Sequence, residues 1–160
     1  MSAKKLRNRP LDFFLVISLV LFAFISFVME IFTTFGVDLK TAADPFGKLW
    51  YFYASSWDPL FLNPPLYLRV MSGIDAFIFG PLYLVAAYGL ARAREWVRIP
   101  GLIMVSAVVY STLVYFGVEF IGETARANLM MVVLINIPYT IVPLLLGFRL
   151  RRTPLFSSKI

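Results

Sequence analysis

Neither cysteine nor histidine occurs among the 160 residues of the chain. A chain without cysteine can form no disulfide framework. Zinc sites built from cysteine and histidine, histidine-ligated haem and the Ser-His-Asp triad are excluded as well, because each needs a residue that is missing. We therefore expect no cofactor and no metal site.

Apolar residues are in excess. They make up 60% of the chain, and the mean hydropathy is +0.80, whereas a soluble domain is about 45–50% apolar. They form four long stretches, at residues 11–33, 66–91, 99–120 and 128–148. Each stretch has the roughly 20 residues that a helix needs to cross a bilayer, and none alternates as a barrel strand does. The sequence predicts an all-α membrane protein, a four-transmembrane-helix bundle forming a single domain over residues 1–160.

The first apolar stretch follows four basic residues, as the core of a signal peptide does. It is longer than such a core, which has about 7–15 residues, and it lacks a small-residue cleavage site. We interpret it as a retained first helix.

Basic residues are distributed unevenly around the four stretches, and the net charge is +6. Eleven flank one side of the expected bundle: Lys4, Lys5, Arg7, Arg9, Arg92, Arg94, Arg98, Arg149, Arg151, Arg152 and Lys159. Lys40, Lys48 and Arg126 flank the other side. The positive-inside rule predicts that both termini are cytoplasmic, in the endoplasmic reticulum membrane of a eukaryote or the plasma membrane of a bacterium. The surplus also attracts anionic lipid headgroups weakly, and we expect no nucleic-acid partner.

The link between the first two stretches, residues 34–65, is too aromatic for a solvated loop. Its aromatic residues include Phe46, Trp50, Tyr51, Phe52, Tyr53, Trp57 and Phe61. Tryptophan and tyrosine favour the membrane interface, where one end of the ring is wet and the other dry. We expect a short interfacial helix around residues 46–56 that lies against the mouth of the bundle and ends before Asp58-Pro59.

Three acidic residues lie within the apolar stretches at informative places. An ionisable group at membrane depth is costly and is a candidate functional site by default. The helix directions place Glu30 about one turn, and Asp75 roughly 14 Å, below the outer surface, within reach of one shared cavity. Glu119 lies at the outer end of the third stretch, where we expect it to be solvated.

The pair Glu30 and Asp75 admits a functional and a structural interpretation. Two close carboxylates in a low dielectric do not both ionise easily, so one should hold a proton. Such a pair can receive a ligand ammonium or a sterol hydroxyl, or pass a proton to a double bond. Alternatively, each acid could simply accept hydrogen bonds from a neighbouring hydroxyl or from Arg69.

Prolines and tyrosines add shape to the expected cavity. Prolines bend transmembrane helices and can open space between them, and they occur at positions 81, 138 and 143. Tyr110, Tyr115 and Tyr139 could direct hydroxyls toward that space. Each tyrosine could equally be a packing or interfacial residue.

Short segments in a fixed order carry a family resemblance. They are Phe-Val-Met-Glu at 27–30, Trp-Tyr at 50–51, Asp-Pro-Leu at 58–60, Pro-Pro at 64–65, Asp75 with Phe77 and Pro81, Trp-Val-Arg-Ile-Pro at 96–100, and Pro-Tyr at 138–139 with Pro143. Together they resemble the EXPERA-domain family, which includes the emopamil-binding sterol isomerase and the sigma-two receptor. The resemblance runs from about Arg9 to Arg152 and is closest to the sigma-two receptor branch.

The resemblance implies roles for individual residues. An acid at the place of Glu30 meets the cationic amine of a ligand, and an acid at the place of Asp75 stands beside it. Asp58 matches a third acid that holds the long link, and Tyr139 matches a tyrosine of the pocket. The isomerase branch uses a histidine near its acids, and this chain has no histidine.

We therefore predict an integral membrane protein of sterol or lipid homeostasis that binds a sterol-like or cationic amphiphilic ligand in an intramembrane pocket. The expected ligand-binding residues are Glu30, Asp75, Tyr110 and Tyr139, and the expected structural residues are Trp50, Asp58 and Pro59. One alternative is a sterol Δ8-Δ7 isomerase-like enzyme with Glu30 and Asp75 as proton carriers. Another is a structural or chaperone-like partner with vestigial acids.

The resemblance also implies a homodimer. Gly101, Ser106 and Ala107 are small residues on the third stretch that permit close helix contact. They could serve contacts between copies or packing within one bundle.

Overall fold

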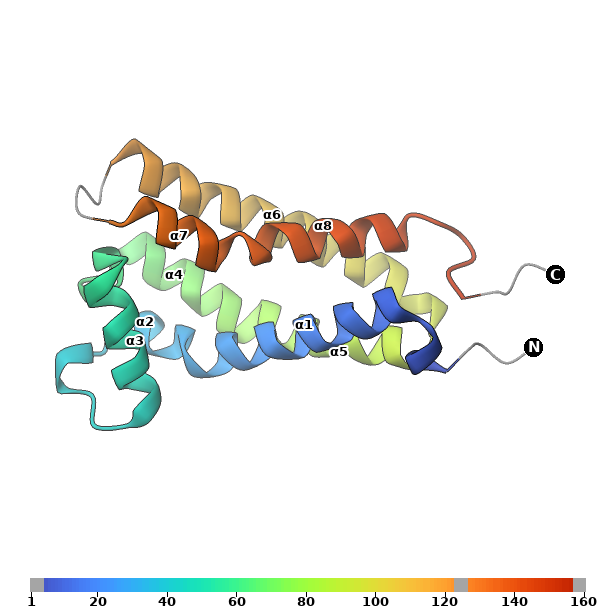
Figure 1. Cartoon of the computed structure of the whole chain (residues 1–160), viewed down its shortest axis with the longest axis horizontal. Coiled ribbons are helices and arrows are strands. Elements are labelled where there is room, and N and C mark those ends of the chain that lie inside the picture. Colours follow the sequence, from blue (N-terminus) through green and yellow to red (C-terminus); the bar gives the residue numbers. More distant parts are fainter. Residues whose placement is uncertain (1–4, 123–126, 157–160) are drawn as a thin grey trace.

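The computed structural model describes residues 5–122 and 127–156. Within these residues every regular element is helical, and four helical stretches are long and apolar enough to cross a membrane: Pro10–Phe35, Leu66–Ala91, Glu95–Ile121 and Leu129–Leu150. The predicted all-α, four-span architecture is confirmed. Both ends of the described chain lie at the same end of the bundle (Figure 1). Lys4, Arg126 and Lys159, which entered the charge count, lie outside the described residues.

The four spans are built from shorter helical segments joined end to end (Figure 1). The elements in chain order are η1 (Leu6–Asn8), α1 (Pro10–Val28), α2 (Glu30–Phe35), η2 (Leu39–Thr41), α3 (Pro45–Ser56), η3 (Pro59–Leu62), α4 (Leu66–Ile74), η4 (Asp75–Phe79), α5 (Gly80–Ala91), η5 (Glu95–Val97), α6 (Arg98–Ile121), α7 (Leu129–Asn136) and α8 (Pro138–Leu150). The first span is therefore α1 with α2, the second is α4, η4 and α5, and the fourth is α7 with α8.

Interruptions occur in three of these spans. A proline has no N–H to bond the carbonyl four residues earlier. Before Pro81 the backbone widens into the π-helical turn η4, which begins at Asp75. Pro138 separates α7 from α8, whereas Pro143 lies inside α8 without ending it. The first span breaks at Met29 without a proline, and this break was not expected from the sequence.

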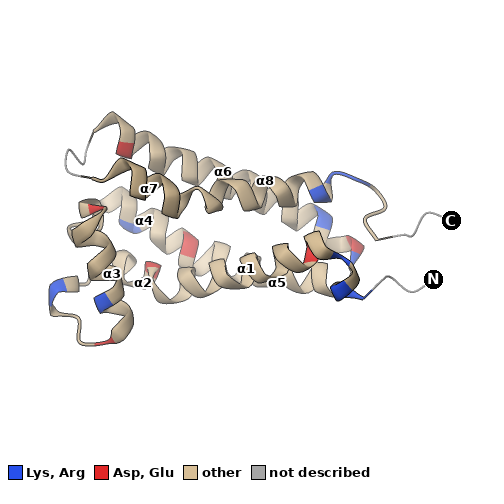
Figure 2. Cartoon of the chain, viewed as in Figure 1, with Lys and Arg blue, Asp and Glu red and all other residues tan. Residues whose placement is uncertain are grey.

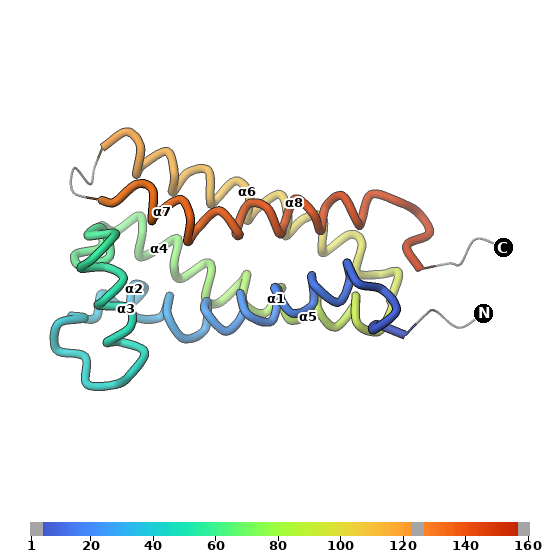
Figure 3. Tube along the Cα trace, in the orientation of Figure 1, coloured from blue at the N-terminus to red at the C-terminus, as the bar shows by residue number. Residues whose placement is uncertain are grey.

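The short helix expected around residues 46–56 is present as α3. Its N-terminus is capped by Asp44, whose Oδ1 accepts hydrogen bonds from the backbone N–H of Phe46 at 3.0 Å and of Gly47 at 2.9 Å. Trp50 Nε1 donates to Thr33 Oγ1 at 3.0 Å, which fastens α3 to the first span. The helix lies at the end of the bundle remote from the termini (Figure 3).

The spans pack most closely as two pairs, α1 with α5 and α6 with α8. The contact between α6 and α8 depends on a small residue, since a Cβ added at Gly101 would lie 2.5 Å from Leu150 Cδ1. Gly101 thus serves packing within the bundle. Ser106 is exposed, and its hydroxyl donates to the Leu102 carbonyl at 3.1 Å.

A buried ion-pair cluster joins three helices at the end that carries the termini. Asp12 is 1% exposed and accepts from Arg9 Nη1 and Arg149 Nε, each at 2.7 Å. Arg9 also donates to the carbonyls of Leu90 at 3.0 Å and Ala91 at 3.1 Å. Asp12, which the sequence shows as an interruption of an apolar run, thus links α1 to α8, and Arg9 links it to the end of α5.

Candidate functional site

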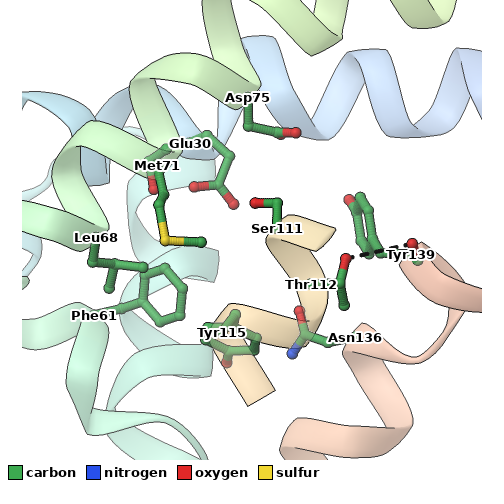
Figure 4. A pocket seen from close by; sticks show the side chains of 11 residues that line it. Glu30, Phe61, Leu68, Met71, Asp75, Ser111, Thr112, Tyr115, Asn136 and Tyr139 are labelled. Atoms are coloured by element: carbon green, nitrogen blue, oxygen red, sulfur yellow. Dashed lines mark hydrogen bonds between the residues drawn. The ribbon is translucent and has the colours of Figure 1, made fainter. Parts of the chain in front are cut away.

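A polar pocket of about 100 Å³ lies where the interrupted spans face one another (Figure 4). Its lining residues are Glu30, Phe61, Leu68, Met71, Ser72, Asp75, Ser111, Thr112, Tyr115, Asn136 and Tyr139. The structure therefore brings together three of the predicted site residues, Glu30 from α2, Asp75 from η4 and Tyr139 from α8. Tyr115, for which the sequence allows either a pocket or a packing position, also lines the pocket.

Asp75 is held by hydroxyl groups from two helices. Ser26 Oγ on α1 donates to Asp75 Oδ2 at 2.5 Å, and Tyr83 OH on α5 donates to Oδ1 at 3.4 Å. Both hydroxyl-bearing residues are fully buried. Asp75 therefore accepts hydrogen bonds from neighbouring hydroxyl groups, as the structural interpretation of the acid pair predicts. Arg69 is not its partner, since its Nε donates to the Thr34 carbonyl at 3.3 Å.

Glu30 is placed differently from Asp75. It is the first residue of α2, directly after the break at Met29, and it is half-buried. Its carboxylate points toward Ser111, into the ring of lining side chains (Figure 4). Glu30 also has a hydrogen bond with the Ser72 side chain, so each acid has a hydroxyl partner, and Glu30 differs from Asp75 in lining the neighbouring apolar space as well as the pocket.

A second, apolar chamber of about 390 Å³ adjoins the polar pocket. Its lining residues are Leu21, Phe24, Ile25, Met29, Glu30, Phe46, Leu49, Trp50, Phe52, Tyr53, Trp57, Ile135, Asn136 and Tyr139. Glu30, Asn136 and Tyr139 line both spaces, so the two meet at these residues. Its volume falls in the range of about 300–1,000 Å³ that is common for ligand sites.

The chamber has walls from elements that are distant in sequence. They are α1, α3 and α7, and α3 contributes exposed aromatic and aliphatic side chains at Phe46, Leu49 and Phe52. Tyr139 is stacked on Phe22, with ring centroids 4.2 Å apart. This stacking fixes the tyrosine ring at the junction of pocket and chamber.

A buried network around Asp58 ties the long link to the site. Asp58 is fully buried, and its Oδ2 accepts from Tyr115 OH and, at 3.2 Å, from Tyr53 OH. Its Oδ1 accepts from the backbone N–H of Leu60 at 3.2 Å. Asn136 Nδ2 donates to Tyr53 OH at 3.1 Å. The network thus joins α3 and η3 to α6 and α7, beside the polar pocket.

Burial governs the electrostatics of this network. It raises the pKa of Asp58 above the ordinary aspartate value, and the hydrogen bonds from Tyr115, Tyr53 and Leu60 offset part of that rise. Burial, together with the charge of Asp58, also raises the pKa of Tyr53. Tyr53 therefore keeps its proton and remains a donor.

Glu119 and Tyr110 on α6 lie differently from what the sequence predicts. Glu119 is 2% exposed, so the expectation that it is solvated is wrong. It shares one face of α6 with Thr112 and Tyr115, and that face is turned inward. Tyr110 is 71% exposed and lines neither the pocket nor the chamber.

Asn136 is a lining residue that the sequence analysis missed. Its Nδ2 donates to the Val132 carbonyl at 2.8 Å as well as to Tyr53 OH at 3.1 Å. Both N–H groups are thereby used, which leaves the amide oxygen as an acceptor beside the cavities. The sequence does contain a signal for Asn136, because a polar amide side chain is unusual within the uncharged apolar stretch 128–148.

Comparisons with known proteins agree with this architecture. The model of the family EXPERA (EXPanded EBP superfamily) matches residues 45–150. The protein named "Sigma intracellular receptor 2" from Xenopus tropicalis is 26% identical over 120 residues, which cover 69% of this chain and 70% of that protein. No solved structure matches the chain significantly. The family match includes Asp58, Asp75 and Tyr139, and Glu30 precedes it. The four apolar spans and these matches together indicate an integral membrane protein.

Proposed function

The chain belongs to the EXPERA family, and from this premise we propose that it binds a sterol-like or cationic amphiphilic ligand within the membrane, in sterol or lipid homeostasis. The polar or cationic end of the ligand lies at Glu30, beside Asp75. Its rigid apolar body lies in the chamber between α1, α3 and α7.

The observation that carries this proposal is the junction of a small polar pocket with a larger apolar chamber at Glu30. A space of about 100 Å³ suits a hydroxyl or ammonium group, and one of about 390 Å³ suits a rigid ring system. Buried apolar area supplies most of the affinity, at about 25 cal/mol per Å². The carboxylate mainly fixes the orientation of the ligand. It adds little net affinity, because the attraction in a buried ion pair is offset by the free energy of removing both charges from water.

A photoreactive cholesterol analogue tests the proposal on the purified protein. Ile135 lines the chamber, so Ile135→Trp should fill it and abolish labelling that unlabelled sterol competes away. Leu144→Trp is the matched control, since Leu144 is exposed on α8 and lines neither cavity. Labelling that survives Ile135→Trp, in protein that melts normally, would exclude the chamber as the binding site.

Two carboxylates on one pocket favour a second candidate, a sterol double-bond isomerase. In that reaction one carboxyl protonates the double bond and a carboxylate removes the proton at the neighbouring carbon. Purified protein in detergent should then convert a labelled Δ8 sterol, and Glu30→Gln should stop the conversion. Binding without conversion would leave the first proposal standing and reject the second.

The proposal includes an orientation. Both ends of the described chain lie on one side of the bundle (Figure 1), and the basic surplus of the sequence supports a cytoplasmic position for that side. The homodimer implied by the family resemblance stays a prediction.

A further inference from the structure

Three basic segments that are far apart in sequence meet at the end of the bundle that carries the termini (Figure 2). Their exposed cations, here called the basic surface, are Lys5, Arg7, Arg92, Arg94, Arg151 and Arg152. They come from the segment before α1, the link after α5 and the tail after α8. The basic surface is remote from the polar pocket and the chamber.

The segment before α1 is fastened to the link after α5. Arg9 Nη1 donates to the Leu90 carbonyl at 3.0 Å, and its Nη2 donates to the Ala91 carbonyl at 3.1 Å. These carbonyls end α5, where a cation is favourable against the helix dipole. The contact holds the segment that carries Arg7 at the end of α5, which Arg92 follows.

The tail after α8 is fastened to the same link from the other side. The carboxylate of Glu95 accepts hydrogen bonds from the backbone N–H groups of Leu155 and Phe156, each at 2.9 Å. The Phe156 ring lies 5.1 Å from the guanidinium of Arg9 and 5.0 Å from that of Arg149. The tail is thus folded back, which brings Arg151 and Arg152 toward the link that carries Arg94.

The two acidic residues that the described chain has at this end are occupied by these fastenings. Asp12 is buried and paired with Arg9 and Arg149. Both oxygens of Glu95 accept from the tail backbone. Among the described residues, the acids at this end are thus engaged with Arg9, Arg149 and the tail backbone rather than with the exposed cations of the basic surface.

With the four spans across the membrane, the basic surface lies at the depth of the lipid headgroups. Pro10, Ala91, Glu95 and Leu150 mark the span ends on this side, and each exposed cation is within about five residues of one of them. The Arg151 guanidinium lies 3.8 Å from the centroid of the Phe148 ring. Cations beside aromatic rings at this depth are typical of the membrane interface.

We propose that the basic surface binds the headgroup of an anionic phospholipid in the leaflet on that side of the membrane. Polybasic segments next to a membrane are attracted to anionic lipids, and the attraction falls off within a Debye length. The contacts of Arg9 and Glu95 hold the three segments that present this charge at one end of the bundle.

Lipid binding to the full-length protein tests this proposal. The protein is placed in nanodiscs of phosphatidylcholine with increasing phosphatidylserine, and bound phosphatidylserine is counted by native mass spectrometry after release. The variants are Arg92→Gln/Arg94→Gln and Arg151→Gln/Arg152→Gln. The matched control is Lys40→Gln/Lys48→Gln, which removes two exposed cations at the opposite end. Melting in phosphatidylcholine alone verifies that each variant folds.

Each double variant of the basic surface should weaken phosphatidylserine binding roughly 30-fold at low ionic strength, with a smaller loss at physiological salt. The control should bind as the wild type does. Equal binding by all variants, an equal loss in the control, or full competition by inorganic phosphate at constant ionic strength would each overturn the proposal.

Discussion

Ser26 in α1 donates a hydrogen bond of 2.5 Å to Asp75, the residue that begins the π-helical turn of the second span. The bond joins the first two spans at the level of the polar pocket. The two acids differ in position, because both line the polar pocket whereas only Glu30 of the two lines the chamber. Asp75 is therefore held between two spans, and Glu30 is the acid at which the pocket and the chamber meet.

Removing this bond should cost stability. Ser26→Ala leaves one oxygen of a partly buried carboxylate without its donor, so we expect the free energy of unfolding to fall by about 1–3 kcal/mol. Ser106→Ala is the matched control, since the Ser106 hydroxyl is exposed and bonds its own helix. Thermal melting of the two variants decides the matter, and equal melting temperatures would contradict a structural role for the bond.

The network around Asp58 should support both folding and binding. Asp58→Ala leaves the buried hydroxyls of Tyr53 and Tyr115 without their acceptor, and we expect a loss of about 1–3 kcal/mol. Ligand binding should fall as well, because the same tyrosines border the pocket and the chamber. A variant with normal melting and lost binding would instead identify Asp58 as a direct ligand contact.

The raised pKa of Asp58 predicts a specific pH dependence of stability. The folded protein holds the Asp58 proton more tightly than the unfolded chain does, so this residue makes stability fall as the pH rises from about 4 to its folded pKa. Asp58→Asn has no titrating group at this position, so it should remove this contribution to the dependence of stability on pH. Melting temperatures of both proteins between about pH 4 and 7 measure the difference, and parallel curves would refute it.

Orientation in the membrane can be tested with tags. The structure places both ends of the described chain together, and the proposed topology puts them in the cytoplasm. In sealed vesicles with the cytoplasmic side inward, tags at both termini should be protected from protease, and a tag near Asp44 should be cleaved. Opposite accessibility of the two termini would mean an odd number of crossings.

The spans and the level of the acid pair were predictable from the sequence. A run of about 20 apolar residues is sufficient to identify a membrane-crossing helix. Alternating helix direction then places Glu30 and Asp75 in the same half of the bundle. Two of the three interruptions follow from Pro81 and Pro138, because proline removes a backbone donor.

The inward faces of the helices were not predictable in the same way. A helix that is apolar on all sides carries no stripe to mark the face that is buried. The position of Glu119 along its helix and the hydroxyl of Tyr110 do not identify the face of α6 on which each residue lies. The chamber lies between α1, α3 and α7, where the rings of Phe24 on α1 and Phe46 on α3 meet. Such a tertiary contact between distant segments leaves no local pattern in the sequence.

The central claim is that Glu30 recognises a cationic group while the chamber holds the apolar body. Radioligand competition with a cationic amphiphilic amine and a neutral sterol of similar size tests it on the wild type, Glu30→Gln and Asp75→Asn. A charge-assisted hydrogen bond contributes about 1.5–3 kcal/mol, so Glu30→Gln should weaken the amine about 10- to 100-fold. The neutral sterol should change little, and Asp75→Asn should affect the amine less than Glu30→Gln does. Equal loss for both ligands in Glu30→Gln, or no loss for either, in protein that melts normally, would contradict the account.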